Sequence, residues 1–398
     1  MPNISLYPLD FNLSQREVGG REVSLEAAIA ETERQDRDVA LRQAHARRIA
    51  GQNEIANQNN SDIQTSQLLM PTHRIGRRVT SSFTLGTAAY LGGGRGEGGS
   101  SGYIDQFKFS SETITEMGIR LITARFYTGT IGNAESGKFV GGTNINNGFY
   151  SRGIDKIDYA KQSIQQVGML LDIPRVSPAG GMGTASTGLL AGGLLETTRL
   201  STRDCIVYDH VSDTHSITAN SLTEDKCAPH NGLSSKVNGY VCSGSRLLWS
   251  GPLIFSYEEI PYYGAAYIAN IVGTSIVSNL ISASFTNDIR GYRAGGYDDV
   301  TEGFFGRVIT GFSYDTKIPL TISTTLNTKK TCADGTGDNI NGFVVGGDTV
   351  TPWSDWKGIR EIERFRYGDE SIAIIGAKLT HERADQGAVA DYGPGFSY

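Results

Sequence analysis

The chain has 398 residues, of which 50 are glycine and only 11 are proline, and 38% are hydrophobic. This length exceeds one ordinary compact domain unless the fold is a large repetitive β architecture, and the glycines follow no Gly-X-Y period, which excludes collagen. The formal net charge of -6 argues against a dedicated nucleic-acid-binding protein, which usually carries a basic face.

Residues 1–77 differ in composition from the rest of the chain, because they contain few large apolar residues and many Gln, Asn, Glu and Arg. Residues 22–50 lack glycine and proline and consist of good helix formers, which predicts one helix with a thin apolar stripe. Residues 52–67 read as a polar linker. Such a segment buries too little apolar surface to order itself, so we expect residues 1–77 to be an attachment arm that docks on another protein chain.

From residue 78 onward a glycine doublet, preceded by a short strand-like phrase, recurs in six copies, of which the fourth ends in Ser-Gly. The doublets end at Gly93, Gly142, Gly193, Gly244, Gly296 and Gly347, at intervals of 49, 51, 51, 52 and 51 residues. Each doublet is followed by a phrase with alternating apolar positions that closes on an aromatic residue, which is typical of a strand with one buried face. The closing aromatics are Phe109, Tyr159, Tyr208, Tyr257, Tyr314 and Tyr367.

About fifty residues with four short strands make one propeller blade, so the pattern predicts an all-β, six-bladed propeller over residues 78–398, with seven blades as the alternative. Glycine doublets permit close backbone packing near the axis or a positive φ. Residues 383–398 copy the stretch that leads into a doublet and then stop. We therefore expect the C-terminal strand to complete the first blade.

A basic residue precedes five of the six doublets, and the fifth repeat has no clear counterpart. These residues are Arg125, Arg175, Lys226, Lys330 and Arg383. Their recurrence favours a structural role, in which the side chains satisfy backbone carbonyls between blades.

The doublets followed by a tyrosine-bearing strand resemble the kelch repeat family, over about 320 residues. The chain departs from the family in lacking the tryptophan expected after each tyrosine, since only Trp249, Trp353 and Trp356 occur. The phrase that begins at Ile104 and the Gly-x-Phe-x-Gly-Gly pattern look like the kelch-like repeats of bacteriophage virion and tail-associated proteins. The resemblance implies a propeller and a place in the virion.

The sequence offers no catalytic, cofactor or metal constellation. Gly94-x-Gly96-x-x-Gly99 matches a dinucleotide fingerprint but is followed by a strand pattern, so we expect an inter-strand loop. His210 and His215 lie five residues apart without supporting ligands, and we expect solvated loop histidines. The cysteines show no zinc spacing, and their spacing leaves open whether any pair forms a disulfide; they are Cys205, Cys227, Cys242 and Cys332.

Residues 260–287 contain no charge, but polar residues and the repeat run through them, so we expect two buried strands and their loop rather than a membrane span. The N-terminus has neither a basic nor an apolar signal region, which predicts a chain without a secretion signal.

The leading hypothesis is a non-enzymatic virion structural or adhesion protein, assembled in the host cytoplasm and present in many copies. Residues 1–77 would dock on other virion chains in the tail, neck or capsid, and the propeller would be displayed for a host-surface glycan or receptor. The first alternative is a propeller enzyme, an oxidase or a glycan-active enzyme, with a site on the ring axis. The second is an intracellular kelch adaptor that recruits a partner protein.

Overall fold

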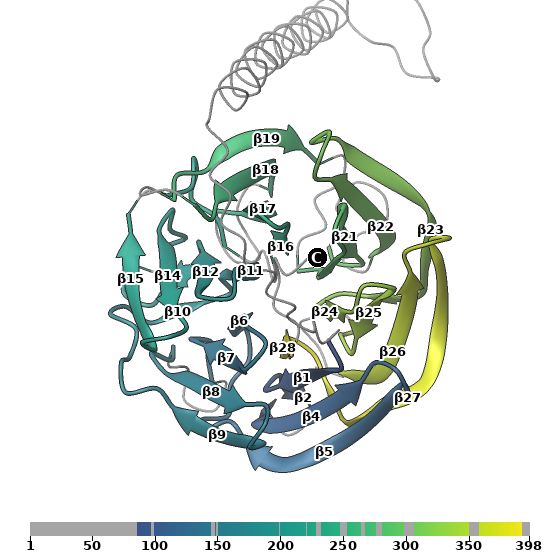
Figure 1. Cartoon of the computed structure of the whole chain (residues 1–398), viewed down its shortest axis with the longest axis horizontal. Coiled ribbons are helices and arrows are strands. Elements are labelled where there is room, and N and C mark those ends of the chain that lie inside the picture. The colour runs from purple at the N-terminus through teal and green to yellow at the C-terminus, as the bar shows by residue number, and fades with distance from the viewer. Residues whose placement is uncertain are drawn as a thin grey trace, which may run out of the picture. The chain divides into compact units, whose positions relative to one another are not determined.

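The computed structural model describes residues 86–96, 99–144, 148, 150–198, 200–219, 221–227, 232–246, 253–263, 267–275, 281–297, 306–349 and 358–391. These residues contain no helix and form six four-stranded antiparallel sheets in a ring around a central axis (Figure 1). The predicted all-β, six-bladed propeller is confirmed over the described ranges, and the seven-bladed alternative is wrong there. The predicted arm of residues 1–77, its helix at 22–50 and the start of the propeller at 78 lie outside the described residues.

The strands of each blade run in chain order from the axis to the rim, except in blade 1. Blade 1 consists of β28 (Gly387–Ala390), β1 (Ala88–Gly92), β4 (Tyr103–Lys108) and β5 (Thr113–Arg120). Blade 2 consists of β6 (Gly129–Gly132), β7 (Ser136–Val140), β8 (Ile154–Asp158) and β9 (Ser163–Gln166). Blade 3 consists of β11 (Ala179–Gly183), β12 (Thr187–Ala191), β14 (Cys205–Asp209) and β15 (Thr214–Thr218).

The second half of the ring has the same plan, with longer outer strands in its last two blades. Blade 4 consists of β16 (Leu233–Ser234), β17 (Asn238–Ser245), β18 (Leu253–Pro261) and β19 (Asn270–Thr274). Blade 5 consists of β20 (Ala283–Thr286), β21 (Arg290–Ala294), β22 (Gly306–Ser313) and β23 (Pro319–Lys330). Blade 6 consists of β24 (Asp334–Gly337), β25 (Asn341–Val345), β26 (Ile359–Arg366) and β27 (Ser371–Arg383). Two short two-stranded sheets complete the described strands. In one, β2 (Arg95–Gly96) pairs with β3 (Gly99–Ser100), and in the other β10 (Arg175–Val176) pairs with β13 (Leu194–Leu195).

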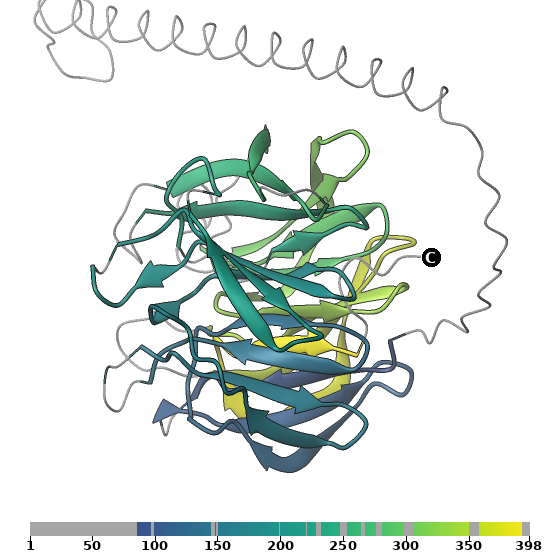
Figure 2. The ribbon, with the colours of Figure 1, turned by 60° about the vertical axis from the view of Figure 1, so that its left-hand side comes forward.

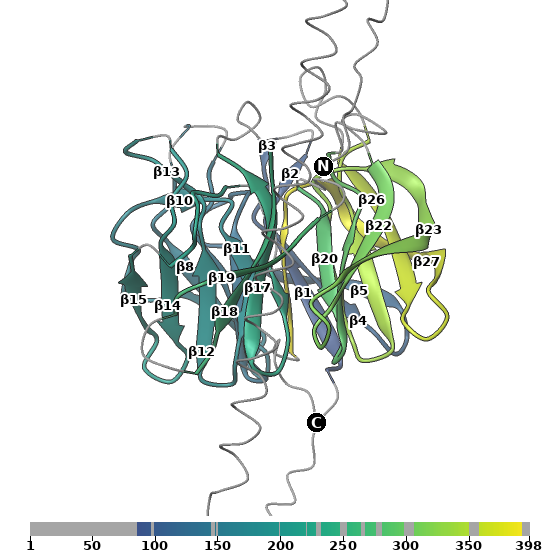
Figure 3. The ribbon, with the colours of Figure 1, turned by 90° about the horizontal axis from the view of Figure 1, so that it is seen from above.

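Burial decreases from the axis to the rim, as expected where sheets stack face to face around a centre. The inner strand β6 and the second strand β7 are buried at every position. The outer strand β5 instead contains only exposed and half-buried residues, because it lies at the rim. Ile114 packs against a core cluster shared with blade 6, and Met117 and Ile119 pack against one shared with blade 2. The sheets lie side by side around the axis when the ring is seen edge-on (Figure 3).

The last described strand closes the ring on the first. β28 pairs with β1 in antiparallel register from Gly92↔Gly387 to Ala89↔Ala390. Figure 2 shows the yellow C-terminal strand among the blue strands that begin the described chain. Blade 1 is therefore built from both ends of the repeat region, which is the arrangement that the truncated last repeat predicts.

The uncharged stretch at residues 260–287 contributes to three strands of the ring. It contains the end of β18 and the whole of β19 and β20, and residues 264–266 and 276–280 within it lie outside the described part. Among the described residues no helix has the length and apolar character needed to cross a membrane.

Candidate functional site

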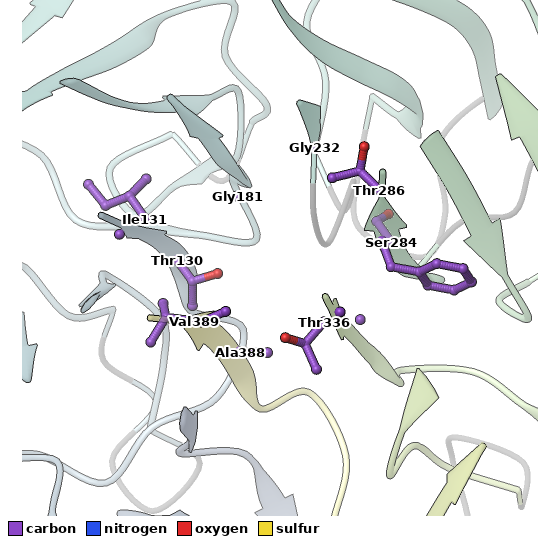
Figure 4. Close-up of a pocket in the computed structure, with 14 residues that line it drawn as sticks. Thr130, Ile131, Gly181, Gly232, Ser284, Thr286, Thr336, Ala388 and Val389 are labelled. Atoms are coloured by element: carbon purple, nitrogen blue, oxygen red, sulfur yellow. The ribbon is translucent and has the colours of Figure 1, made fainter. Parts of the chain in front are cut away.

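A cavity of about 90 Å³ lies on the ring axis and is walled by the inner strands of the blades (Figure 4). Hydroxyl groups of Thr130, Ser284 and Thr336 lie around the central space, whereas the side chain of Ile131 points away from it. The other wall residues are small or apolar; they are Gly132, Gly181, Gly232, Phe285, Thr286, Gly335, Gly337, Ala388, Val389 and Ala390. None of the described wall residues carries a charge, so this part of the wall suits a neutral ligand or solvent.

At the other end of the inner strands, a chain of backbone hydrogen bonds runs from blade to blade around the axis. Ser177 donates to the carbonyl of Tyr127 at 2.9 Å, and Tyr127 donates to that of Asp385 at 3.1 Å. Asp385 donates to Cys332 at 2.8 Å, and Cys332 donates to Ile281 at 3.0 Å. We call these five residues the ring mouth.

Every residue of the ring mouth has a left-handed backbone, with φ between 50° and 56°. None of them is glycine, so each conformation is unfavourable in isolation. The backbone hydrogen bond to the neighbouring blade offsets the unfavourable energy of this conformation. Each residue also lies two positions before an inner strand, so the ring mouth sets the direction in which all these strands enter the axis.

The carboxylates at the ring mouth are neutralised by one buried arginine. The guanidinium of Arg95 pairs with Asp385 and lies 3.5 Å from both Asp348 and the sulfur of Cys332. Arg95 and both aspartates are buried. The carboxylates of Asp348 and Asp385 are thus held in an ion-pair network and not presented to a substrate.

A basic residue in each of four connections joins one blade to the next. The carbonyl of Arg125 accepts a hydrogen bond from Gly94 of blade 1 at 2.9 Å. Its guanidinium reaches into blade 2, where it donates to the carbonyl of Phe139 and pairs with Asp155, both at 3.0 Å. The same arrangement recurs as Lys226–Glu258 at 2.7 Å, Lys330–Glu363 at 2.9 Å and Arg383–Asp105 at 2.5 Å, and the side chains of all eight ion-pair residues are buried.

Arg175, the fifth predicted basic residue, uses carbonyls alone. Ile206 occupies the place of the carboxylate in blade 3, as shown by its pairing with Leu190. Arg175 donates to the carbonyls of Gly192 at 3.0 Å and Asp204 at 3.4 Å. Arg175 thus has only the role expected from the sequence, which is to donate to backbone carbonyls. The other four residues also pair with a buried carboxylate, and these carboxylates were not predicted.

Blade 5 has no such ion pair among its described residues. Thr310 stands at the carboxylate position, opposite Arg293. Arg293 instead reaches back to the hydroxyl of Ser243 in blade 4. The absence of a carboxylate here matches the absence of a basic residue before the fifth doublet.

All six predicted doublet glycines have a positive φ, from 74° at Gly93 to 142° at Gly244. In blade 1, however, the predicted glycine lies one residue before the structurally equivalent one. Gly94, and not Gly93, donates to the carbonyl of Arg125, as Gly142 donates to that of Arg175. Three consecutive glycines at 92–94 leave this register ambiguous in the sequence.

Close packing between blades depends on a second set of glycines, five residues before the doublet's last glycine. A Cβ on Gly342 would overlap the ring of Phe285 in the inner strand of the preceding blade. The same relation holds for Gly137 with Val389, Gly188 with Ile131, Gly239 with Met182 and Gly291 with Leu233. These glycines were not predicted, although five copies at a constant offset mark them in the sequence.

Four of the six closing aromatics occupy the same structural position in their blades, which is defined by a backbone hydrogen bond to the inner turn. The backbone N–H of Tyr159 donates to Glu135 at the inner turn of its blade, and Phe109, Tyr314 and Tyr367 make the same bond. In blades 3 and 4 this bond is made by His210 and Tyr262. Tyr208 and Tyr257 therefore lie two and five residues earlier than the position that the sequence pattern assigned to them, because Tyr208 fills the place of Ile157 and β18 contains a bulge.

The described histidines do not form a metal site. The expectation of solvated loop residues is wrong for both histidines, because His210 is buried between blades and His215 is half-buried within β15. His381 lies 3.4 Å from Glu116 on the rim. Among the described ranges no group of three or more His, Cys, Asp or Glu side chains is placed to hold a metal ion. His45, His73 and His230 lie outside those ranges.

Two further sequence motifs have structural roles. The glycine-rich run at Gly94–Gly99 contains β2 and β3, which pair as Arg95↔Ser100 and Gly96↔Gly99, so no helix follows the first strand as a dinucleotide site requires. The four cysteines are free and buried. The question left open by their spacing is thereby answered, since no disulfide joins them.

Comparison with known proteins adds no relative to this description. Neither the protein-family models nor the curated protein sequences match the chain.

Proposed function

We propose that the chain is a non-enzymatic structural and adhesion protein of a phage particle. Residues 1–77 would dock on other virion chains, and the propeller would be displayed outward in many copies for recognition of a host-surface glycan or receptor. The kelch-like repeats and their phage-like phrases support the virion assignment, and the polar, helix-forming composition of residues 1–77 supports the docking role.

The observation that carries the non-enzymatic part is the use of buried charge. The buried ion pairs between blades, such as Arg125–Asp155 and Arg383–Asp105, hold neighbouring sheets together. The carboxylates of Asp348 and Asp385 are neutralised by Arg95. A propeller enzyme with an axial site would need such groups accessible to its substrate.

The exposed loops support a recognition role. The turns after the inner strands of blades 4, 5 and 6 present Val237, Ile289 and Ile340, which are 52%, 57% and 63% exposed. The equivalent turn residues of blades 2 and 3 are Glu135 and Ser186, which are polar. Three neighbouring blades thus each present one exposed aliphatic side chain on this face, and such residues are available for contact with a partner.

The experiment is a sedimentation test on particles from the culture that produces the chain. Antibodies against the propeller are used to follow the full chain and a variant that lacks residues 1–77 through a density gradient. We expect the full chain to sediment with particles and to be labelled by immunogold on their outer surface, and the variant to remain at the top. A full chain that stays at the top contradicts the proposal.

A second assay tests whether the propeller binds a host-surface glycan or acts as an enzyme. The purified full chain is mixed with host cells before and after periodate oxidation of their surface glycans, and we expect binding that the oxidation removes. Glycan cleavage or alcohol oxidation by the purified chain would replace the proposal with the propeller enzyme.

A further inference from the structure

A pair of side chains fills the same place in every blade interface. One member lies on the second strand of a blade, and the other is the residue that closes the third strand of the next blade. Four pairs are aromatic and stacked, with ring centroids 4.6 to 5.6 Å apart; they are Tyr90–Tyr159, Tyr240–Tyr314, Tyr292–Tyr367 and Phe343–Phe109. In the interface of blades 3 and 4, Leu189 and Tyr262 belong to one apolar cluster. We call these six pairs the seams.

The seam between blades 2 and 3 is the exception, because its members are Lys138 and His210. Both side chains are buried, and the Lys138 ammonium lies 2.9 Å from Nδ1 of His210. The ammonium also donates to the hydroxyl of Ser136 at 2.8 Å and lies 5.3 Å from the ring centre of Tyr208. No carboxylate contacts this ammonium in the described structure.

This geometry fixes the protonation state of the histidine. An ammonium can only donate, so Nδ1 of His210 must accept and the imidazole must be neutral, with its proton on Nε2. A second proton on the imidazole would remove this hydrogen bond and leave two cations 2.9 Å apart inside the protein. Neutral aromatic pairs at the other seams cannot undergo this change.

The surrounding charges do not compensate. Asp213 favours the charged form of both His210 and Lys138, but it is already engaged by the Lys156 ammonium at 2.5 Å and by the hydroxyl of Tyr208 at 3.0 Å. Asp209 favours protonation of His210 and Glu135 favours the charged form of Lys138, but Lys156 opposes both. Burial remains the dominant influence on each member of the pair.

We propose that the seam between blades 2 and 3 is a pH-sensitive joint, which acidification loosens while the five other seams hold. Loosening means that β7 and the strands of blade 3 that face it lose protection before the rest of the ring. The inference concerns the fold and is independent of the proposed function.

The direction and the pH window follow from linkage. Burial, reinforced by the charge of Lys138, lowers the pKa of His210 to about 3 from an unfolded value of 6.5. Its contribution to stability is therefore complete above pH 6.5 and is lost as the pH falls toward 3. Burial also lowers the pKa of Lys138 to about 8. The ammonium remains mostly charged at neutral pH, and its titration adds stability only above pH 8.

The test compares the wild-type chain with the double variant Lys138→Tyr/His210→Tyr, which copies the Tyr90–Tyr159 seam. Denaturant unfolding is measured from pH 7.5 to pH 4, with His381→Gln as the control for a histidine on the rim. Each pH unit below about 6 should lower the wild-type folding equilibrium constant by up to about tenfold relative to the double variant. His381→Gln should follow the wild type. Equal pH profiles for the wild type and the double variant would overturn the proposal.

A second measurement does not depend on the folding of the double variant. Hydrogen exchange of the wild-type chain at pH 5 should show loss of protection in β7, β12 and β14 relative to β21 and β25. The imidazole signals of His210, followed by NMR, should remain those of a neutral ring at pH 5. Uniform protection across the blades at pH 5, or titration of His210 near pH 6.5 in the folded chain, would contradict the proposal.

Discussion

The carboxylate of Asp391 accepts hydrogen bonds from the backbone N–H groups of Thr87 and Ala88 at 2.7 and 3.0 Å, although Asp391 and Ala88 are 303 residues apart in the chain. In the five other blades the equivalent bonds are local. The side chain of Asp338, for example, accepts from Ile340 and Asn341 at 2.7 Å each, and Asn133, Thr184, Ser235 and Asn287 cap their turns in the same way. The chain is thus interrupted at the inner turn of blade 1, and Asp391 rebuilds that turn from the other end of the ring.

The first prediction concerns this capping bond. Asp391→Ala should lower the free energy of unfolding by about 1 kcal/mol, the usual effect of losing a side chain that caps backbone N–H groups. Urea unfolding measures the change, and Asp338→Ala is the matched variant in an uninterrupted hairpin. If Asp338→Ala lowers the free energy of unfolding and Asp391→Ala leaves it unchanged, Asp391 does not cap the inner turn of blade 1.

The second prediction concerns the buried ion pair across the closure. Asp105→Asn leaves the guanidinium of Arg383 buried without its carboxylate, so the free energy of unfolding should fall by about 3–5 kcal/mol. Asp158→Asn, which removes the partner of exposed Lys161, is the control and should leave the melting temperature unchanged. Equal melting temperatures for the two variants would contradict the joining role of Arg383.

The third prediction concerns packing between blades 5 and 6. Gly342→Ala should lower the free energy of unfolding by about 1–3 kcal/mol, because the added methyl group would overlap the ring of Phe285. Gly368→Ala is the control, since a Cβ there meets nothing within 4 Å. Addition of Phe285→Leu to Gly342→Ala should recover part of the loss in calorimetry. A neutral Gly342→Ala would show that the blades are further apart than described.

The fourth prediction concerns half-buried ion pairs that link neighbouring blades near their outer turns. Lys317 of blade 5 pairs with Glu259 of blade 4, and Asp213 of blade 3 pairs with Lys156 of blade 2 with the signs reversed. Glu259→Lys should therefore lower the free energy of unfolding by about 1 kcal/mol through repulsion of Lys317. The double variant Glu259→Lys/Lys317→Glu should unfold at the wild-type urea concentration. Additive losses in the double variant would mean that the two charges do not act on each other.

The repeats predict the number of blades and the closing strand because both follow from spacing. Five glycine doublets and the pair Ser243–Gly244 follow six second strands, and the incomplete last repeat leaves one inner strand to be supplied from the C-terminal end. It was harder to predict which residue of each repeat occupies a given structural position. Three glycines at 92–94 and the bulged strand β18 shift the pattern without changing its period, so Gly93, Tyr208 and Tyr257 were assigned to positions that Gly94, His210 and Tyr262 occupy.

The contacts around the axis could not be predicted, because different residue types occupy the equivalent positions in the different blades. The ring mouth uses Tyr127, Ser177, Ile281, Cys332 and Asp385 at one backbone position, where a hydrogen bond to the next blade and not side-chain chemistry selects the left-handed conformation. The buried carboxylates were overlooked for a related reason. Asp105, Asp155, Glu258 and Glu363 follow the register of each sheet, and that register becomes visible only when the strands are paired.

The most direct test of the closed ring is thermal unfolding of two truncated chains. One chain ends at Gln386 and lacks β28, and the other ends at Asp391 and keeps every contact described for β28. The closed ring predicts that the chain ending at Asp391 unfolds in one cooperative transition near the wild-type temperature. The chain ending at Gln386 should unfold at a much lower temperature or lack a cooperative transition. Equal melting temperatures for the two chains would contradict closure by the C-terminal strand.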